Sequence, residues 1–68
     1  MELSAILTEA PEGGYVAMNP ETGTTTQGES VEAALANLRE ATELFLEEFP
    51  INITVRPILT TFHVAEHA

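Results

Sequence analysis

The sequence predicts an α+β fold: an antiparallel meander of three strands, one long helix packed across it, and a terminal strand. Three observations lead to this prediction. The first 28 residues contain short β-like segments separated by Gly- and Pro-containing turns. A long segment with apolar residues at helical spacing follows, and a second β-like segment lies near the end of the sequence. The predicted order is β-β-β-α-β in a single domain, residues 1–68.

The first three strands are predicted at Met1–Thr8, Tyr15–Met18 and Thr24–Gln27. The first alternates with a period of two, which is typical of a strand with one buried face. That face is expected to hold Met1, Leu3, Ala5 and Leu7. Gly13-Gly14 supplies positive φ without a steric cost and predicts a hairpin loop. Asn19–Gly23 forms a second turn cluster, so the three strands are expected to form a meander.

A helix is predicted from Ser30 to about Phe49. The hydroxyl of Ser30 can accept a backbone N–H of the first turn, and Pro50 ends the helix. One apolar stripe is expected to face the sheet, formed by Val31, Ala34, Leu35, Leu38, Ala41, Phe45 and Phe49. Most charged residues of the segment fall off this stripe, namely Glu32, Arg39, Glu40, Glu43 and Glu47.

The fourth strand is predicted at Ile58–Val64. The preceding β-like run Ile53–Val55 is interrupted by Arg56-Pro57, and proline is tolerated at the start of a strand. Inward positions are expected to be Ile58, Phe62 and Val64, with Leu59, Thr61 and His63 on the other face. The tail Ala65–Ala68 is expected to fray.

Size and composition predict self-association. A chain of 68 residues buries only about 60% of the surface that its unfolded form exposes. Cysteine is absent, so neither a disulfide framework nor a Cys-based zinc site can compensate. A homo-oligomer, a dimer or tetramer, is therefore expected.

The net charge is −9, from eleven Glu and no Asp against Arg39 and Arg56. This balance disfavours direct binding to nucleic acid, which depends on Lys and Arg. It would attract a basic protein partner, although it could equally serve solubility alone. Met1-Glu2-Leu3 lacks the positive region of a signal peptide, and no apolar run is long enough to span a membrane. A cytoplasmic protein without membrane association is expected.

No arrangement of residues points to catalysis or a cofactor, so we expect a protein that is not an enzyme. Metal-dependent nucleases need converging carboxylates, whereas the Glu residues here fall in turns and on the solvent face of the helix. His63 and His67 with Glu66 could suggest a metal site, but a strand and a mobile tail would not align them. Two surface histidines explain them better, and Gly13-Gly14 is better explained by a hairpin than by phosphate binding.

Two places are candidates for oligomer or partner contact. The first is Tyr15, which could instead belong to the core with its hydroxyl at the rim. The second is Thr60-Thr61-Phe62-His63 of the terminal strand, which could leave an open sheet edge with no Lys to protect it. Alternatively, the terminal strand is internal and contributes only to the fold.

The chain resembles the HicB-like antitoxin family over residues 3–48, and its terminal segment 56–62 resembles the last strand of short members. The resemblance rests on the order and spacing of Glu12-Gly13-Gly14-Tyr15-Val16-Ala17, Pro20, Thr26-Gln27-Gly28, Ser30, Ala34-Leu35-Ala36-Asn37-Leu38-Arg39-Glu40-Ala41 and Glu43-Leu44-Phe45-Leu46-Glu47-Glu48. It implies a partial ribonuclease-H-like fold in a short single-domain member without the C-terminal DNA-binding domain.

The resemblance also implies a function. Members of the family pair with HicA toxins, which are small basic mRNA interferases, and block the active face of the toxin. The expected function is thus a non-catalytic antitoxin of a toxin–antitoxin pair. The alternative is a stand-alone oligomeric HicB-like protein that binds another protein or a small ligand without a toxin partner.

Overall fold

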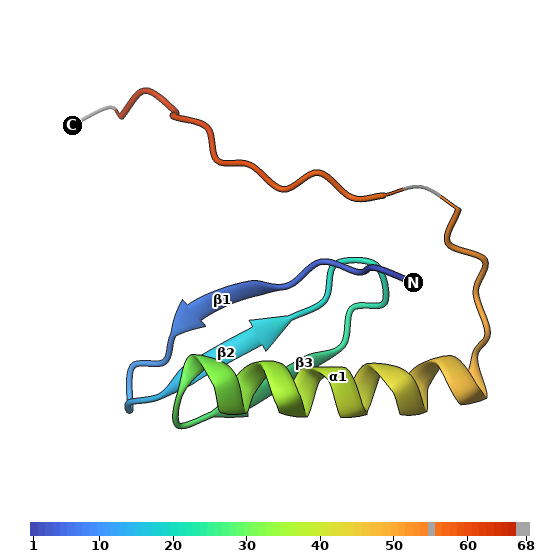
Figure 1. Cartoon of the computed structure of the whole chain (residues 1–68). Helices are drawn as coiled ribbons and strands as arrows, with labels where there is room; N and C mark the ends of the chain where they lie inside the picture. The colour runs from blue at the N-terminus through green and yellow to red at the C-terminus, as the bar shows by residue number, and fades with distance from the viewer. Residues whose placement is uncertain (55, 67–68) are drawn as a thin grey trace.

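The chain forms a three-stranded antiparallel sheet with one helix packed across one face, in a computed structural model that describes residues 1–54 and 56–66. Strands β1 (Ile6–Glu9), β2 (Tyr15–Met18) and β3 (Thr25–Gly28) lie in the order β1-β2-β3, and helix α1 (Val31–Glu48) follows them. Figure 1 shows α1 crossing in front of β3, with β2 and β1 above them, and a long extended segment after the helix. The predicted α+β class and the antiparallel meander are confirmed.

Two hairpins set the register of the sheet. Leu7 pairs with Ala17, and Ala17 pairs with Thr26 on the other side. Gly13 and Gly14 have φ of 104° and 80°, a region that L side chains disfavour, so these two glycines permit the first hairpin. The amide of Ala10 donates to the Gly14 carbonyl at 3.0 Å and closes that turn. The predicted role of the glycine pair is confirmed.

The core lies between β2 and the middle of α1 and is small. Its fully enclosed apolar residues, among those described, are Ala17, Ala34 and Leu38. Ala5, Leu7 and Tyr15 pack against them and are partly buried. Because alanines form two of the three central positions, the helix approaches the sheet closely but buries little apolar area.

The helix begins as predicted. Ser30 is its N-cap, and the Ser30 hydroxyl accepts the Ala33 amide at 3.1 Å. At the other end the Phe49 amide donates to the Phe45 carbonyl at 2.8 Å. Within the described ranges, no helix has the length and apolar character needed to cross a membrane.

The predicted apolar stripe is broader than the face that the helix buries. The buried positions of α1 are Ala34, Leu38 and Thr42, one turn apart. Val31, Leu35 and Phe49 are exposed, because the helix packs mainly across β3 and β2. The off-stripe charged residues are exposed as predicted.

Two strand boundaries differ from the prediction. The first strand begins at Ile6 and not at Met1, because Ile6 pairs with Met18, the last residue of β2. The third strand is shifted by one residue to Thr25–Gly28. Gly28 is the last residue of β3 and lies against the first turn of the helix.

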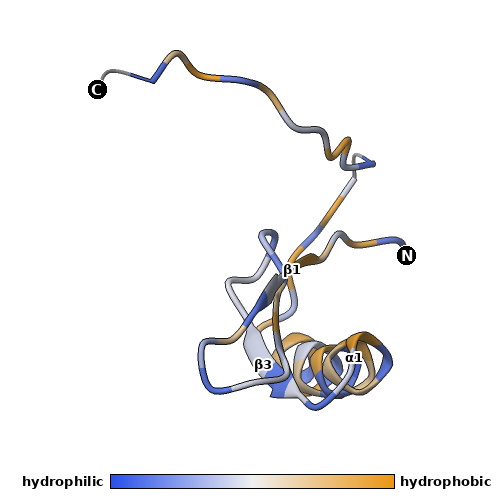
Figure 2. Cartoon of the chain, turned by 90° about the vertical axis from the view of Figure 1, so that its left-hand side faces the viewer, coloured by the Kyte–Doolittle hydropathy of each residue, from blue (hydrophilic) through white to orange (hydrophobic). Residues whose placement is uncertain are grey.

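The predicted fourth strand is wrong for the fold of a single chain. Residues 56–66, which we call the arm, are extended but pair with none of the described strands. Ile58 is 90% exposed and Phe62 82%, and Val64, the third position expected to face inward, is exposed as well. In both Figure 1 and Figure 2 the arm runs clear of the sheet and the helix. Val55, His67 and Ala68 lie outside the described residues, as do the parts of the predictions that concern them.

Candidate interaction surfaces

A buried polar cluster joins residues 1–5, which we call the N-terminal stretch, to the turn between β2 and β3. At its centre is Asn19, which is 1% exposed. The Asn19 amide nitrogen donates to the Ser4 carbonyl at 2.7 Å and to the Glu21 carboxylate at 2.6 Å. The Asn19 carbonyl oxygen accepts the Thr22 amide at 2.9 Å and the Thr22 hydroxyl at 2.6 Å. Every hydrogen-bonding position of this side chain is therefore used, as burial of an amide requires.

Glu21 is the carboxylate of this cluster. The Ser4 hydroxyl donates to it at 2.6 Å and the Ser4 amide at 2.9 Å. These bonds from Ser4, with a further one from Asn19, favour the charged form and lower the pKa of Glu21 below its usual 4.5, against the opposing effect of desolvation. These partners belong to the turn and the N-terminal stretch, so the cluster joins these two parts of the fold.

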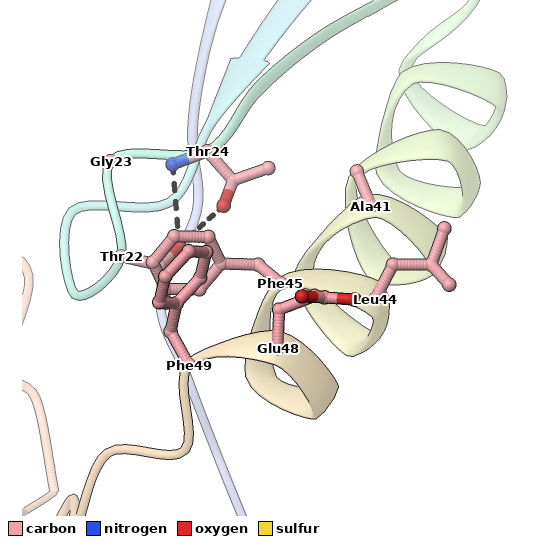
Figure 3. Close-up of a pocket in the computed structure, with 8 residues that line it drawn as sticks. All are labelled: Thr22, Gly23, Thr24, Ala41, Leu44, Phe45, Glu48 and Phe49. Carbon is pink, nitrogen blue, oxygen red and sulfur yellow. Dashed lines mark hydrogen bonds between the residues drawn. The ribbon is translucent and has the colours of Figure 1, made fainter.

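A cleft of about 410 Å³ lies between the β2–β3 turn and the C-terminal half of α1. We call it the aromatic cleft. It is lined by Thr22, Gly23, Thr24, Ala41, Leu44, Phe45, Glu48 and Phe49. The rings of Phe45 and Phe49 lie 5.2 Å apart, centroid to centroid, at 38°. Figure 3 shows the two rings beside the Thr22–Thr24 turn, with Glu48 projecting from the last turn of the helix.

The C-terminal half of the helix is strongly electronegative. Glu40, Glu43, Glu47 and Glu48 are all exposed there. The C-terminus of a helix already carries a partial negative charge, and the last turn of α1 has no basic residue to offset it. The aromatic cleft therefore opens beside an uncompensated negative helix end.

A second and larger depression, of about 830 Å³, lies between residues 1–5, which lead into β1, and the helix α1. We call it the β1 groove. It exists because α1 packs mainly across β3 and β2, so the face of the N-terminal stretch and β1 toward the helix is left partly uncovered. Its lining consists of Met1, Leu3, Ser4, Ala5, Asn19, Glu32, Leu35, Ala36, Leu38, Arg39, Thr42, Glu43 and Leu46.

The structure does not bring the predicted contact residues together. Tyr15 lies in β2, half-buried against the core cluster, in agreement with its structural interpretation. Thr60, Thr61, Phe62 and His63 lie in the arm and are all exposed. The Thr60 hydroxyl donates to the neighbouring Thr61 carbonyl at 3.3 Å, a local contact.

Among the described residues, no group of three or more His or Glu side chains lies close enough to hold a metal ion. His63 is exposed in the arm next to Phe62, and His67 lies outside the described range.

Both depressions were missed by sequence reasoning. The i, i+4 spacing of Phe45 and Phe49 was assigned to the buried stripe, although Phe49 is 60% exposed. The position of Phe49 beside Pro50, past the last helical residue, is the signal that could have placed it at the surface. Nothing in the sequence reports the lateral offset of the helix from β1, which creates the β1 groove.

Comparison of the chain with protein-family models, with curated proteins and with solved structures finds no match.

Proposed function

We propose that this chain is a non-catalytic binding module of the antitoxin type, which neutralises a small basic ribonuclease resembling HicA. The observation that carries the proposal is the aromatic cleft beside the electronegative end of α1. The HicB-like order of motifs and the net charge of −9 support the same function. We also propose that the chain has the partial ribonuclease-H-like topology that the resemblance implies.

The cleft suits an Arg or Lys side chain of a basic partner. A guanidinium stacks favourably on an aromatic face, and Phe49 is 60% exposed to receive one. Glu48 lines the same cleft and can pair with the cation. The helix C-terminus adds its own attraction for positive charge. Binding a basic protein here would relieve the repulsion among the four carboxylates of this helix end.

The first test is co-expression with the protein encoded by the adjacent open reading frame. We expect that neighbour to be small and basic, to be toxic alone and to co-purify with this chain. A neighbour of another kind, or failure of the two proteins to co-purify, would defeat the antitoxin assignment.

The second test locates the contact. Replacing Glu40, Glu47 and Glu48 with Gln removes three charges from the C-terminal half of the helix, and we expect affinity for the basic partner to fall roughly tenfold or more at low salt. Replacing Glu9, Glu12 and Glu29 with Gln removes the same charge from the other end of the molecule and is the matched control. Phe49→Ala should also weaken binding, with Ile51→Ala as its control. Equal effects of the two triple variants would mean that net charge alone acts.

The alternative is a stand-alone oligomeric protein that binds another protein or a small ligand. The exposed arm favours this alternative, because it provides an element for self-association. Native mass spectrometry of the purified protein separates the two functions, since a retained small molecule would support the alternative.

A further inference from the structure

We infer that the arm of one copy docks along the free edge of β1 and over the β1 groove of a second copy, reciprocally, to form a two-fold dimer. The occupant of the groove is therefore residues 56–66 of the partner chain. This inference does not depend on the antitoxin function.

The arm has the composition of a strand that is to be covered. Ile58, Phe62 and Val64 fall on one side of an extended chain, with Thr60 between the first two. All three are largely exposed in the single chain, and Leu59 is 54% exposed. Figure 2 shows hydrophobic stretches along the arm with no part of the domain over them. Apolar side chains gathered on a segment of this length mark a contact site.

The sheet offers one edge that suits such a strand. β1 is at the end of the sheet and pairs with β2 alone among the described strands. On the opposite edge strand, β3, one backbone carbonyl is already used by the helix, because the Asn37 side chain donates to the Gln27 carbonyl at 2.7 Å. An added strand would therefore pair with β1.

The β1 groove lies beside residues 1–5, which lead into that edge, and its lining includes apolar side chains. Leu3, Leu35 and Leu46 line it. A strand that pairs with β1 and continues alongside residues 1–5 places alternate side chains on the side that faces the helix, and therefore over these leucines. The groove would receive Ile58 and Phe62 or Phe62 and Val64, depending on the register.

The distribution of charge along the chain favours the arm of a second copy as the occupant of the β1 groove. Residues 1–48 hold ten of the eleven glutamates against Arg39, and so carry the whole net charge of the chain. In residues 49–68, Arg56 and Glu66 cancel. A neutral arm can approach the acidic domain of a second copy without the repulsion that any other part of the chain would meet.

Two prolines favour exchange over return of the arm to its own domain. Pro50 follows the end of the helix and Pro57 opens the arm, and each restricts the chain to extended conformations. An ion pair between the arm and its own domain joins Arg56 to Glu2 at 3.5 Å and is highly exposed, so it holds the arm weakly. Because each copy supplies one arm and one edge, the exchange closes with two-fold symmetry.

Disulfide trapping tests the inference directly, because the chain has no cysteine of its own. Thr8→Cys on β1 and Thr61→Cys in the arm are introduced into separate full-length chains, which are mixed and oxidised. We expect a covalent heterodimer on a non-reducing gel. Thr25→Cys on β3 mixed with Thr61→Cys is the matched control and should give little product. Equal trapping at both edges would overturn the inference.

A chain that carries both Thr8→Cys and Thr61→Cys distinguishes docking of the arm on a second copy (exchange) from docking on its own domain. Exchange gives covalent dimers, whereas an intrachain disulfide in a monomer would mean that the arm docks on its own domain, and would overturn the inference.

Light scattering coupled to size exclusion provides the second readout. The unmodified chain should be a dimer by mass. Thr61→Pro and Phe62→Glu should each be monomers by mass, and circular dichroism should show that they remain folded. Thr54→Pro, the same substitution outside the arm, should leave the dimer intact. A monomeric parent chain, or a dimer that survives both arm variants, would contradict the inference.

Discussion

Asn19 holds Ser4 in place: its side-chain amide donates to the Ser4 carbonyl at 2.7 Å, and this bond fastens the N-terminal stretch to the β2–β3 turn. Ser4 is itself buried, although it precedes the first strand residue, Ile6. The stretch before β1 is thus positioned by a side chain and not by strand pairing. Since Leu3 and Ala5 flank Ser4 and line the β1 groove, the same bond sets one wall of that groove.

Asn19→Ala should therefore be strongly destabilising. It removes four hydrogen bonds and leaves the Ser4 carbonyl and the Glu21 carboxylate short of a donor. We expect a loss of about 2–4 kcal/mol in the free energy of unfolding. Urea denaturation measures it, with the exposed Asn52→Ala as a control that should change stability by less than about 0.5 kcal/mol. Similar values for both variants would show that the cluster contributes little.

Glu21 makes stability depend on pH at the acidic end. Its pKa is lowered in the folded state by the bonds from Ser4, so the carboxylate contributes stability at pH values above its usual 4.5. That contribution is lost as the pH falls through the lowered folded pKa. Glu21→Gln should be less stable than the unmodified chain at neutral pH. Between about pH 5 and about pH 3 it should also lose less stability than the unmodified chain. Thermal melts across that pH range measure how the melting temperature changes with pH. The same change in both proteins would contradict a stabilising role for the Glu21 carboxylate.

Local sequence patterns predict most of this fold. The Gly13-Gly14 hairpin, the Ser30 cap and the exposed charges of the helix depend on neighbours in the chain, and each was predicted correctly. The terminal strand was not, because β-like alternation in Ile58–Val64 reports a tendency to pair but not the identity of the partner strand.

The candidate site was harder to predict, because it depends on contacts distant in sequence. Ser4 and Asn19 are separated by fifteen residues, and their types suggest a strand residue and a turn residue when taken singly. The aromatic cleft likewise depends on the turn at Thr22–Thr24 reaching the end of α1. Tertiary packing decides such contacts, and no periodicity in the sequence reports them.

Gly28→Ala should disrupt the junction of β3 and α1. A Cβ at this position would lie 2.3 Å from the Ala34 amide nitrogen, and backbone atoms of a helix cannot move aside. We expect a cost of about 3 kcal/mol or more in the free energy of unfolding. Gly23→Ala is the control. Gly23 has φ of 81° but no atom within 4 Å of the added Cβ, so the cost there should be about 1–2 kcal/mol. A Gly28→Ala variant as stable as Gly23→Ala would show that the helix can shift on the sheet.

Replacing Thr42 or Thr22 with Val should change the free energy of unfolding in opposite directions. The Thr42 hydroxyl oxygen is buried without a hydrogen-bond partner among the described residues. Thr42→Val replaces it with a methyl group of nearly the same shape and should raise the free energy of unfolding by about 1 kcal/mol. The Thr22 hydroxyl instead donates to Asn19 and contacts the Thr24 hydroxyl at 2.6 Å. Thr22→Val breaks that network and should lower the free energy of unfolding by about 1–2 kcal/mol. Paired urea titrations at pH 7 compare the two variants with the parent chain. Destabilisation by Thr42→Val would mean that the Thr42 hydroxyl has a hydrogen-bond partner in solution. That partner would lie in the β1 groove, which Thr42 lines.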